Sequence, residues 1–362
     1  MKKFWAATVD AFSTFLKVPG TVTKKGAHVR DAIDLKRIMI IVVIALVPAA
    51  LFGMWNVGYQ HSLAIGDGRL QILANFWYGF LKVLPLYVVS YGVGLFIEFF
   101  CAGLRNEEVN EGYLVSGMLI PLIVPVTIPL WMLAIAVAFS VIFVKEVFGG
   151  TGMNIWNPAL VTRAVLFFSY PSAMSGSQCW ISLKAGEQVV DGFTGATPLA
   201  LDGASAQYGT GVWDYIIGTV PGSVGETSII AILLGAAILL WTGIASWRIM
   251  LSSVLGAIVV GGIANAFGVG MPFWEQLIVG GFAFGTVFMA TDPVTSAQTE
   301  RGKVIYGALI GAICVIVRLF NPGYAEGMML AILLGNTFAP LIDHYVVNGT
   351  MKRRNKAAAK TA

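Results

Sequence analysis

The chain has 362 residues, of which 57% are hydrophobic and 12% are charged, with a formal net charge of +4. Its mean hydropathy is +0.78. Since about a quarter of the residues in a soluble domain are charged, this composition excludes an ordinary soluble protein. The apolar runs have the ~20 residues that cross a bilayer as a helix, not the short alternating segments of a membrane barrel. We therefore expect an all-α integral membrane protein, with no nucleic-acid partner.

The chain begins with a polar extension, residues 1–37, that holds eight Lys/Arg and three Asp/Glu. No apolar core follows Lys2 and Lys3, so this segment does not resemble a signal peptide. The last segment, residues 347–362, holds five basic residues and no acidic ones, and we expect it to be disordered. Residues 176–227 hold one lysine and five acids. Because basic residues favour the cytoplasmic side, we predict both termini in the cytoplasm and the 176–227 loop outside.

Between these ends we predict about ten transmembrane helices in two halves, residues 38–175 and 228–346. The predicted ranges are 38–56, 76–100, 113–128, 129–147, 158–175, 228–247, 249–268, 275–291, 303–320 and 324–346. Prolines at 121, 125 and 129 interrupt the third and fourth ranges, which leaves open a broken helix or a re-entrant loop there. The 42 glycines are typical of helices that approach closely or are broken inside a bundle.

Ionisable residues within or beside the apolar runs are candidates for function, because charges at membrane depth are costly. Glu98 and Asp343 stand near helix ends, and Asp292 lies at a break. Each either belongs to an ion pathway or serves as an ordinary interfacial cap. Arg163 and Arg318 lie within apolar runs, where they would neutralise a carboxylate or the phosphate of a flavin.

Two segments, residues 148–158 and 284–293, resemble each other. Each combines glycine with a polar residue directly before a proline, Asn157 in the first segment and Asp292 in the second. Transporter folds place their binding sites at broken helices in corresponding positions of two halves. The two segments therefore predict an internal repeat with a binding site, although chance similarity between glycine-rich spans is an alternative.

Redox metals and nucleotide motifs are not indicated by the sequence. Cys101, Cys179 and Cys314 are far apart and show no C-x-x-C spacing, so they predict no iron–sulfur or other metal cluster. The chain has no P-loop and no dinucleotide fingerprint after a strand, so we do not expect NADH to bind here. Any redox chemistry is then expected to come from organic cofactors.

The run from Asp191 to Thr197, D-G-F-T-G-A-T, contains a threonine presented in a polar loop. A threonine hydroxyl is a poor nucleophile and needs an enzyme that grips a bendable segment, for which Gly192 and Gly195 are suited. The run is similar to the D-G-x-(S/T)-G-A-T motif at which flavin transferases join FMN to a threonine. This resemblance marks Thr197 as the residue that carries FMN through a phosphoester, whereas the alternative is a plain Gly/Thr-rich turn.

Several further segments extend the resemblance over nearly the whole chain. Together with the flavin motif, the segments are Pro19 to Thr23, His28 to Arg37, Glu108 to Gly112, Gly149 to Pro158 and Thr291 to Pro293. They resemble the B subunit of the sodium-translocating NADH:quinone reductase. The D subunit of the Rnf complex shares the flavin motif but begins close to its first span, so the extension at residues 1–37 favours the B subunit.

The resemblance implies a bundle similar to the urea-transporter fold in a bacterial inner membrane, with partner subunits, quinone and sodium. Beside the covalent FMN it implies a noncovalent riboflavin, for which Asn154, Asn157 and Asp292 are the candidate ligands, since amides and a carboxylate suit the polar edge of a flavin. Glu98 and Asp343 become candidates for sodium coupling, because hard cations prefer oxygen ligands. The rival from another class is a small-solute transporter or channel of the same fold, which explains the repeat but not the flavin motif.

Overall fold

The protein is seen in a computed structural model that describes residues 9, 25–27, 35–67, 71–105, 112–177, 179–184, 186–191, 193–201, 212–321 and 326–361. Within these residues it is all-helical, with no strand, as predicted. The expected extension lies mostly outside the described residues, and so do Glu108 to Glu111 and Gly192.

The helices of the first half begin the fold. They are α2 (Leu35–Ala64), α3 (Ile72–Arg105), α4 (Tyr113–Ile123), α5 (Leu130–Ser140), the π-helix η1 (Val141–Glu146), α6 (Pro158–Ser169) and α7 (Pro171–Met174). Two short elements follow, the 3-10 helix η2 (Pro198–Leu201) and α8 (Val212–Ile217). The second half contains α9 (Ile229–Trp241), α10 (Trp247–Ala266), α11 (Glu275–Ile278), α12 (Phe282–Phe284), the π-helix η3 (Gly285–Met289), α13 (Glu300–Phe320) and α14 (Met328–Thr361).

Five of these helices are long and apolar enough to cross a membrane, which confirms a multi-pass membrane protein. The five segments are Arg37–Ala64, Ile72–Arg105, Trp247–Ala266, Glu300–Phe320 and Met328–Ala359. The other predicted spans fall on shorter or broken helices, so the count of ten stays a prediction. The helical structure is interrupted between the third and fourth predicted ranges, as the prolines indicated. Helix α4 ends at Ile123, and α5 begins after Pro129.

Helix α2 continues eight residues past its predicted end at residue 56, because its polar side chains have partners inside the fold. The amide of Asn56 donates to the carbonyl oxygen of Val220 at 3.0 Å, and the amide of Gln60 donates to that of Thr219 at 2.9 Å. Both side chains are buried. The helix therefore continues through polar residues, because the carbonyl oxygens of a loop distant in sequence accept their hydrogen bonds.

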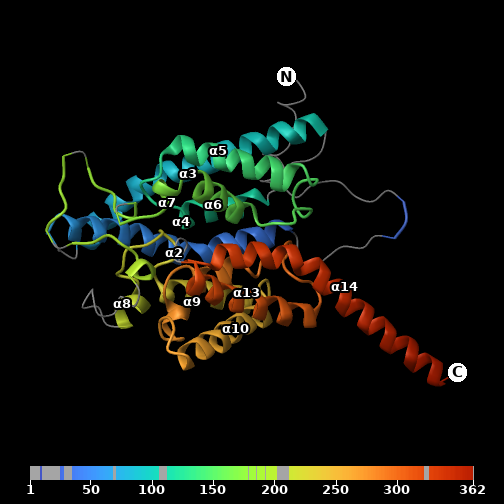
Figure 1. Ribbon diagram of the computed structural model, residues 1–362. Helices are drawn as coiled ribbons and strands as arrows, with labels where there is room; N and C mark the ends of the chain where they lie inside the picture. Colours follow the sequence, from blue (N-terminus) through green and yellow to red (C-terminus); the bar gives the residue numbers. More distant parts are fainter. Residues whose placement is uncertain are drawn as a thin grey trace.

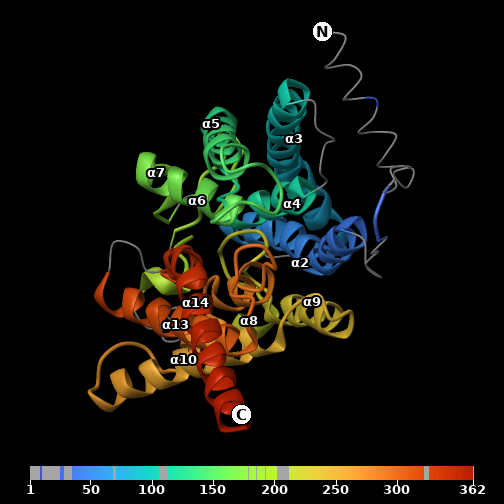
Figure 2. The ribbon, with the colours of Figure 1, turned by 90° about the vertical axis from the view of Figure 1, so that its right-hand side faces the viewer.

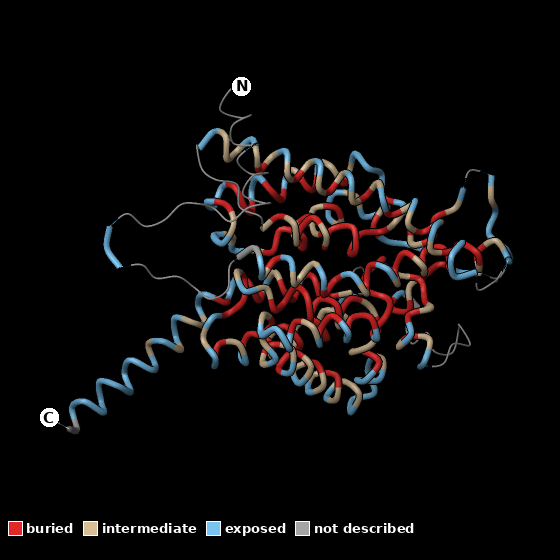
Figure 3. Tube along the Cα trace, turned by 180° about the vertical axis from the view of Figure 1, so that it is seen from behind, coloured by how far each residue is buried: buried red, intermediate tan, exposed pale blue. Residues whose placement is uncertain are grey.

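The C-terminal segment is helical, and our prediction of disorder for it was wrong. Helix α14 runs to Thr361 and projects from the body of the molecule (Figure 1), with exposed residues along its projecting part (Figure 3). Ala, Lys and Arg are strong helix formers, and no proline or glycine follows Gly349 in the sequence. Helix propensity therefore extends the last span into solvent without packing to support it.

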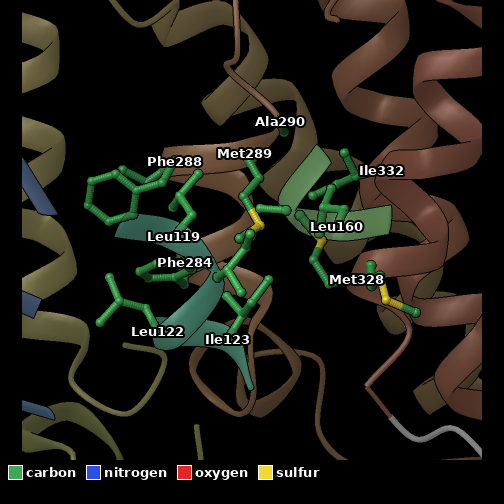
Figure 4. Packing of buried hydrophobic residues seen from close by; sticks show 14 of the residues in the cluster. Leu119, Leu122, Ile123, Leu160, Phe284, Phe288, Met289, Ala290, Met328 and Ile332 are labelled. Atoms are coloured by element: carbon green, nitrogen blue, oxygen red, sulfur yellow. The ribbon is translucent and has the colours of Figure 1, made fainter. Parts of the chain in front are cut away.

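The two halves lie side by side, with α2 next to α9 at their border (Figure 2). The apolar core lies where the halves meet (Figure 4). It combines Leu119, Leu122 and Ile123 of α4 and Leu160 of α6 with Phe284, Phe288, Met289, Met328 and Ile332 of the second half. Small residues allow close crossings: a Cβ on Gly79 would stand 1.7 Å from the carbonyl oxygen of Met54, and one on Gly311 would stand 1.9 Å from that of Ser253.

Candidate functional site

The structure contains two cavities that include predicted site residues. The larger has a volume of about 1030 Å³ and is lined by Thr197, by the loop before α9 and by residues of α6, α11 and α13. The smaller has a volume of about 70 Å³ and is lined by Asn154, Asn157 and Asp292 together with residues of α2, α4 and α9. The structure thus places Thr197 at one cavity and the three predicted riboflavin ligands at the other.

Thr197 lies directly before η2 in a packed segment. Its carbonyl oxygen accepts from the backbone amide of Ala200 at 2.9 Å, and its side chain is half-buried on the cavity wall. Gly195 and Ala196 are buried. A Cβ on Gly195 would stand 2.2 Å from the carbonyl oxygen of Ser177, so this glycine is needed for close approach. The segment that we expected to be bendable is thus closely packed at Gly195, whereas Asp191 and Thr194 are exposed.

The segment just before the flavin motif is anchored to α2 and α3. The ring of His61 contacts Glu187 through Nε2 at 2.8 Å and stacks on the ring of Tyr78, with centroids 4.0 Å apart. The hydroxyl of Tyr78 donates to the carbonyl oxygen of Ser182 at 2.8 Å. The backbone amide of Lys184 and, to a smaller extent, His61 lower the pKa of Glu187 below its ordinary value. These contacts hold in place the chain segment that precedes the flavin motif.

A buried ion cluster borders the larger cavity. The guanidinium of Arg163 on α6 donates to Glu226 at 2.6 Å through Nη1 and to Glu326 through Nη2. Glu226 also accepts from the hydroxyl of Ser223. Because Glu326 belongs to the second half and Glu226 to the loop before it, Arg163 connects the first half to both. Of the two roles predicted for this arginine, the structure shows neutralisation of a carboxylate.

Arg318 has a different environment. Its guanidinium donates to the backbone carbonyl oxygens of Gln276 at 2.6 Å, Val279 at 3.0 Å and Glu326 at 3.1 Å. A guanidinium satisfied by carbonyl oxygens ties together the chain segments before α12 and before α14. Arg318 therefore holds the backbone of the cavity wall.

The smaller cavity brings the three predicted riboflavin ligands together from both halves. The amide of Asn157 donates to Asp292 Oδ2 at 3.3 Å, while its Oδ1 accepts from the backbone amide of Ala159 at 3.0 Å and caps α6. Asp292 also accepts from the backbone amide of Val294 and from the hydroxyl of Thr295, each at 3.1 Å. Asn154 lines the same cavity.

The structure separates the two predicted sodium residues. Glu98 on α3 is buried and paired with Lys145 of η1. Asp343 on α14 accepts from the backbone amides of Gln298 and Thr299, at 2.7 and 3.0 Å, and from the hydroxyl of Thr299 at 2.6 Å. Since Thr299 is the N-cap of α13, Asp343 stabilises a helix start. Among the described residues, no group of three or more His, Cys, Asp and Glu side chains is placed to hold a metal ion.

Two parts of these sites were not predicted from the sequence. Lys145, which we expected to reach the cytoplasmic interface from its place near a span end, is buried and lines the smaller cavity. Glu226 and Glu326 were not singled out, yet both contact Arg163. For Lys145 the available signal was an ionisable residue beside an apolar run, whereas Glu226 and Glu326 lie in turns, and only the tertiary structure reveals which opposite charge each one faces.

Comparison with known proteins places the chain in a family. The sequence profile described as the NQR2, RnfD, RnfE family matches residues 22–352. The chain belongs to this family. Similar family members, named as the B subunit of Na(+)-translocating NADH-quinone reductase, include one from Chromohalobacter salexigens that is 47% identical over 99% of this chain and 92% of its own length. Those from Stutzerimonas stutzeri and Pseudomonas aeruginosa PAO1 are each 46% identical over 97% of this chain and 93% of their own length.

Proposed function

We propose that this chain is the B subunit of a sodium-translocating NADH:quinone reductase, in which it passes electrons to quinone while sodium crosses the membrane. The observation that carries the proposal is the end-to-end match to family members bearing that name. The chain works with other subunits of the complex, because it has no nucleotide motif of its own for NADH. It lies in the inner membrane of a bacterium as a bundle similar to the urea-transporter fold, with about ten spans.

Thr197 carries FMN through a phosphoester that a flavin transferase forms. The motif from Asp191 to Thr197 supports this assignment, and so does the position of Thr197 on the wall of a cavity of about 1030 Å³. Ligand pockets typically have volumes of ~300–1,000 Å³, so this cavity is large enough for an attached flavin. The flavin would supply electron transfer when bound, and the residues that line the cavity beside Thr197 would bind and orient it.

A noncovalent riboflavin is held by Asn154, Asn157 and Asp292. These side chains offer both donors and acceptors, which match the polar edge of a flavin ring. The cavity volume of about 70 Å³ lies well below the ~300 Å³ of small ligand pockets. The polar groups fit the ligand but the volume does not, so binding requires the cavity walls on α2 and α9 to move apart.

The proposed topology puts FMN and the reduction of quinone on opposite sides of the membrane. We propose that both termini are cytoplasmic, that residues 1–37 and 347–362 are cytoplasmic segments, and that residues 176–227 form an external loop between the halves 38–175 and 228–346. Charge asymmetry supports this arrangement. In addition, α8 lies at the opposite end of the molecule from the C-terminal end of α14 (Figure 1). FMN then stands outside, while quinone is reduced toward the cytoplasm and Glu98 and Asp343 serve sodium coupling.

The alternatives make different predictions. The D subunit of an Rnf complex belongs to the same family, but the similar family members carry the B-subunit name. A solute transporter would need no flavin on Thr197. The test is the purified complex containing a tagged copy of this chain. We expect NADH-driven quinone reduction that requires sodium and flavin fluorescence on the denatured protein; ferredoxin-dependent activity would indicate the Rnf alternative, and absence of fluorescence a transporter.

A further inference from the structure

We propose that Lys145 is an internal competitor for sodium at Glu98. In the sodium-free state its ammonium pairs with Glu98, and when sodium binds to Glu98 the ammonium turns into the smaller cavity toward Asp292. This inference rests on the proposed sodium-coupling role of Glu98 and adds the residue that makes sodium binding there conditional.

The first observation is the burial of the pair. The side chains of Lys145 and Glu98 are 4% and 5% exposed, and the ammonium donates directly to Oε1. An ionised carboxylate in such a place needs a cation, because an unpaired buried charge is strongly destabilising. While it is ionised, Glu98 is therefore a site for one monovalent cation, and in this structure that cation is the ammonium of Lys145.

The second observation is the free oxygen of Glu98. Oε2 is buried and has no hydrogen-bond partner among the described residues. This carboxylate uses only one of its two oxygens as an acceptor. Its second oxygen can therefore coordinate a hard cation, which prefers oxygen ligands. The neighbouring carboxylate does not compete for Lys145, because Glu146 has its own cation in Arg105, at 3.1 Å from Nη1. Lys145 and Glu98 thus form a one-to-one pair in which sodium can replace the ammonium without changing the charge at Glu98.

The third observation is a second place for the ammonium. Lys145 lines the smaller cavity together with Asn157 and Asp292. Within the described part of the chain no salt bridge reaches Asp292, which accepts only from neutral or backbone groups. The cavity of about 70 Å³ exceeds the ~10–15 Å³ that a cavity needs to hold one water molecule. In this closed state, with no flavin between the walls, the cavity therefore has room for an ammonium with a water molecule.

An aromatic ring stands beside the ammonium and can support it as it moves. The ammonium of Lys145 lies 5.6 Å from the centroid of the Tyr113 ring. A cation over an aromatic face is stabilised outside water, and a lysine has a flexible stem of four carbons. When the ammonium moves, one positive charge is added to the interior as sodium, and the carboxylate of Asp292 gains the ammonium as its partner.

Two substitutions of Lys145 are expected to act in opposite directions. Lys145→Met removes the competing cation, so that sodium can bind Glu98 without competition from the ammonium. Lys145→Arg introduces a guanidinium that can donate to both carboxylate oxygens of Glu98. We would measure the midpoint of thermal unfolding of the assembled complex over a series of NaCl concentrations, with choline chloride keeping ionic strength constant. The sodium concentration for half-maximal stabilisation should fall about tenfold or more in Lys145→Met, equivalent to ~1.4 kcal/mol, and should rise in Lys145→Arg.

The controls separate this inference from the proposed function. Lys184→Met, at an exposed lysine, should leave the sodium midpoint unchanged. Glu98→Gln should abolish the sodium effect; if the effect persists there, the sodium site is elsewhere and the proposed role of Glu98 fails. If Glu98→Gln abolishes the effect but both Lys145 variants keep the wild-type sodium midpoint, the site stands and the competition by Lys145 is wrong. Should Lys145→Met not assemble, an unchanged or lower midpoint in Lys145→Arg is sufficient to overturn the inference.

Discussion

The amide of Asn157 donates a hydrogen bond to Asp292 at 3.3 Å across 135 positions of sequence. Each residue precedes a proline, and each follows a π-helix, η1 in the first half and η3 in the second. π-helices are rare and often occur at functional sites. The contact shows that the two chain breaks meet in one place, as expected of a site built by corresponding segments of two halves.

The first prediction concerns this contact. Asn157→Leu and Asp292→Leu should each remove the noncovalent flavin, because each replaces a polar ligand by an apolar side chain that also fills the small cavity. Covalent FMN should remain. The measurement is acid-extractable riboflavin per complex, compared with fluorescence of the denatured protein. Asp343→Asn, which alters a carboxylate outside this cavity, is the matched control, and normal riboflavin content in both Leu variants would place the carrier elsewhere.

The second prediction concerns the ion cluster that joins the halves. Arg163→Met leaves Glu226 and Glu326 buried without their shared cation, and breaking a buried pair typically costs ~3–5 kcal/mol. The complex should therefore lose stability, seen as a lower temperature of thermal inactivation. Arg163→Lys should recover only part of the loss, because one ammonium cannot reproduce the two-pronged contact. Lys184→Met is the control at an exposed lysine, and equal stability of all three variants would show that the cluster does not join the halves.

The third prediction concerns pH. The pKa of Glu187 is lowered from its ordinary value of 4.5, chiefly by the backbone amide of Lys184 and then by His61. A lowered pKa means that the anchoring is fully present above pH 4.5 and is lost as the pH falls through the folded-state value. The protection of residues 186–191 against hydrogen exchange, measured relative to an unstructured peptide at the same pH, should therefore fall only in acid. In Glu187→Gln the protection should be lower already at neutral pH, and protection that is independent of both pH and this substitution would contradict the anchoring role.

The fourth prediction concerns topology. In a background without Cys101, Cys179 and Cys314, a thiol at Lys184→Cys should react with an impermeant reagent from the outside only. A thiol at the exposed Met351, Met351→Cys, should react from the cytoplasmic side only. Labelling of both thiols from the same side would exclude the proposed arrangement and the external position of FMN.

Much of the fold follows from the sequence because membrane composition leaves few choices. Long apolar runs specify helices, and polar residues before prolines predicted the breaks at Asn157 and Asp292, which the structure brings together. Helix ends were less predictable. Asn56 and Gln60 looked like the end of a span, but carbonyl groups 164 and 159 positions away satisfy them.

The charges of the sites were the hardest to predict. Lys145 stands near a span boundary in the sequence, where a lysine ordinarily reaches water, but the turn of η1 directs it inward to Glu98. The partners of Arg163 lie 63 and 163 positions away. Gly195 looked like a flexible residue, whereas the carbonyl oxygen of Ser177 excludes any side chain there. Each of these facts depends on packing between segments that sequence proximity does not reveal.

The central claim is that Thr197 carries FMN, and the mass of the peptide containing Thr197 tests it most directly. The peptide from the purified complex should carry the FMN increment on the Thr197 hydroxyl, and the denatured protein should fluoresce. Thr197→Val should lose both signals. Thr194→Ala, which changes the neighbouring hydroxyl of the motif, tests whether that group serves only recognition by the transferase. An unmodified Thr197 peptide, or fluorescence that survives in Thr197→Val, would contradict the account.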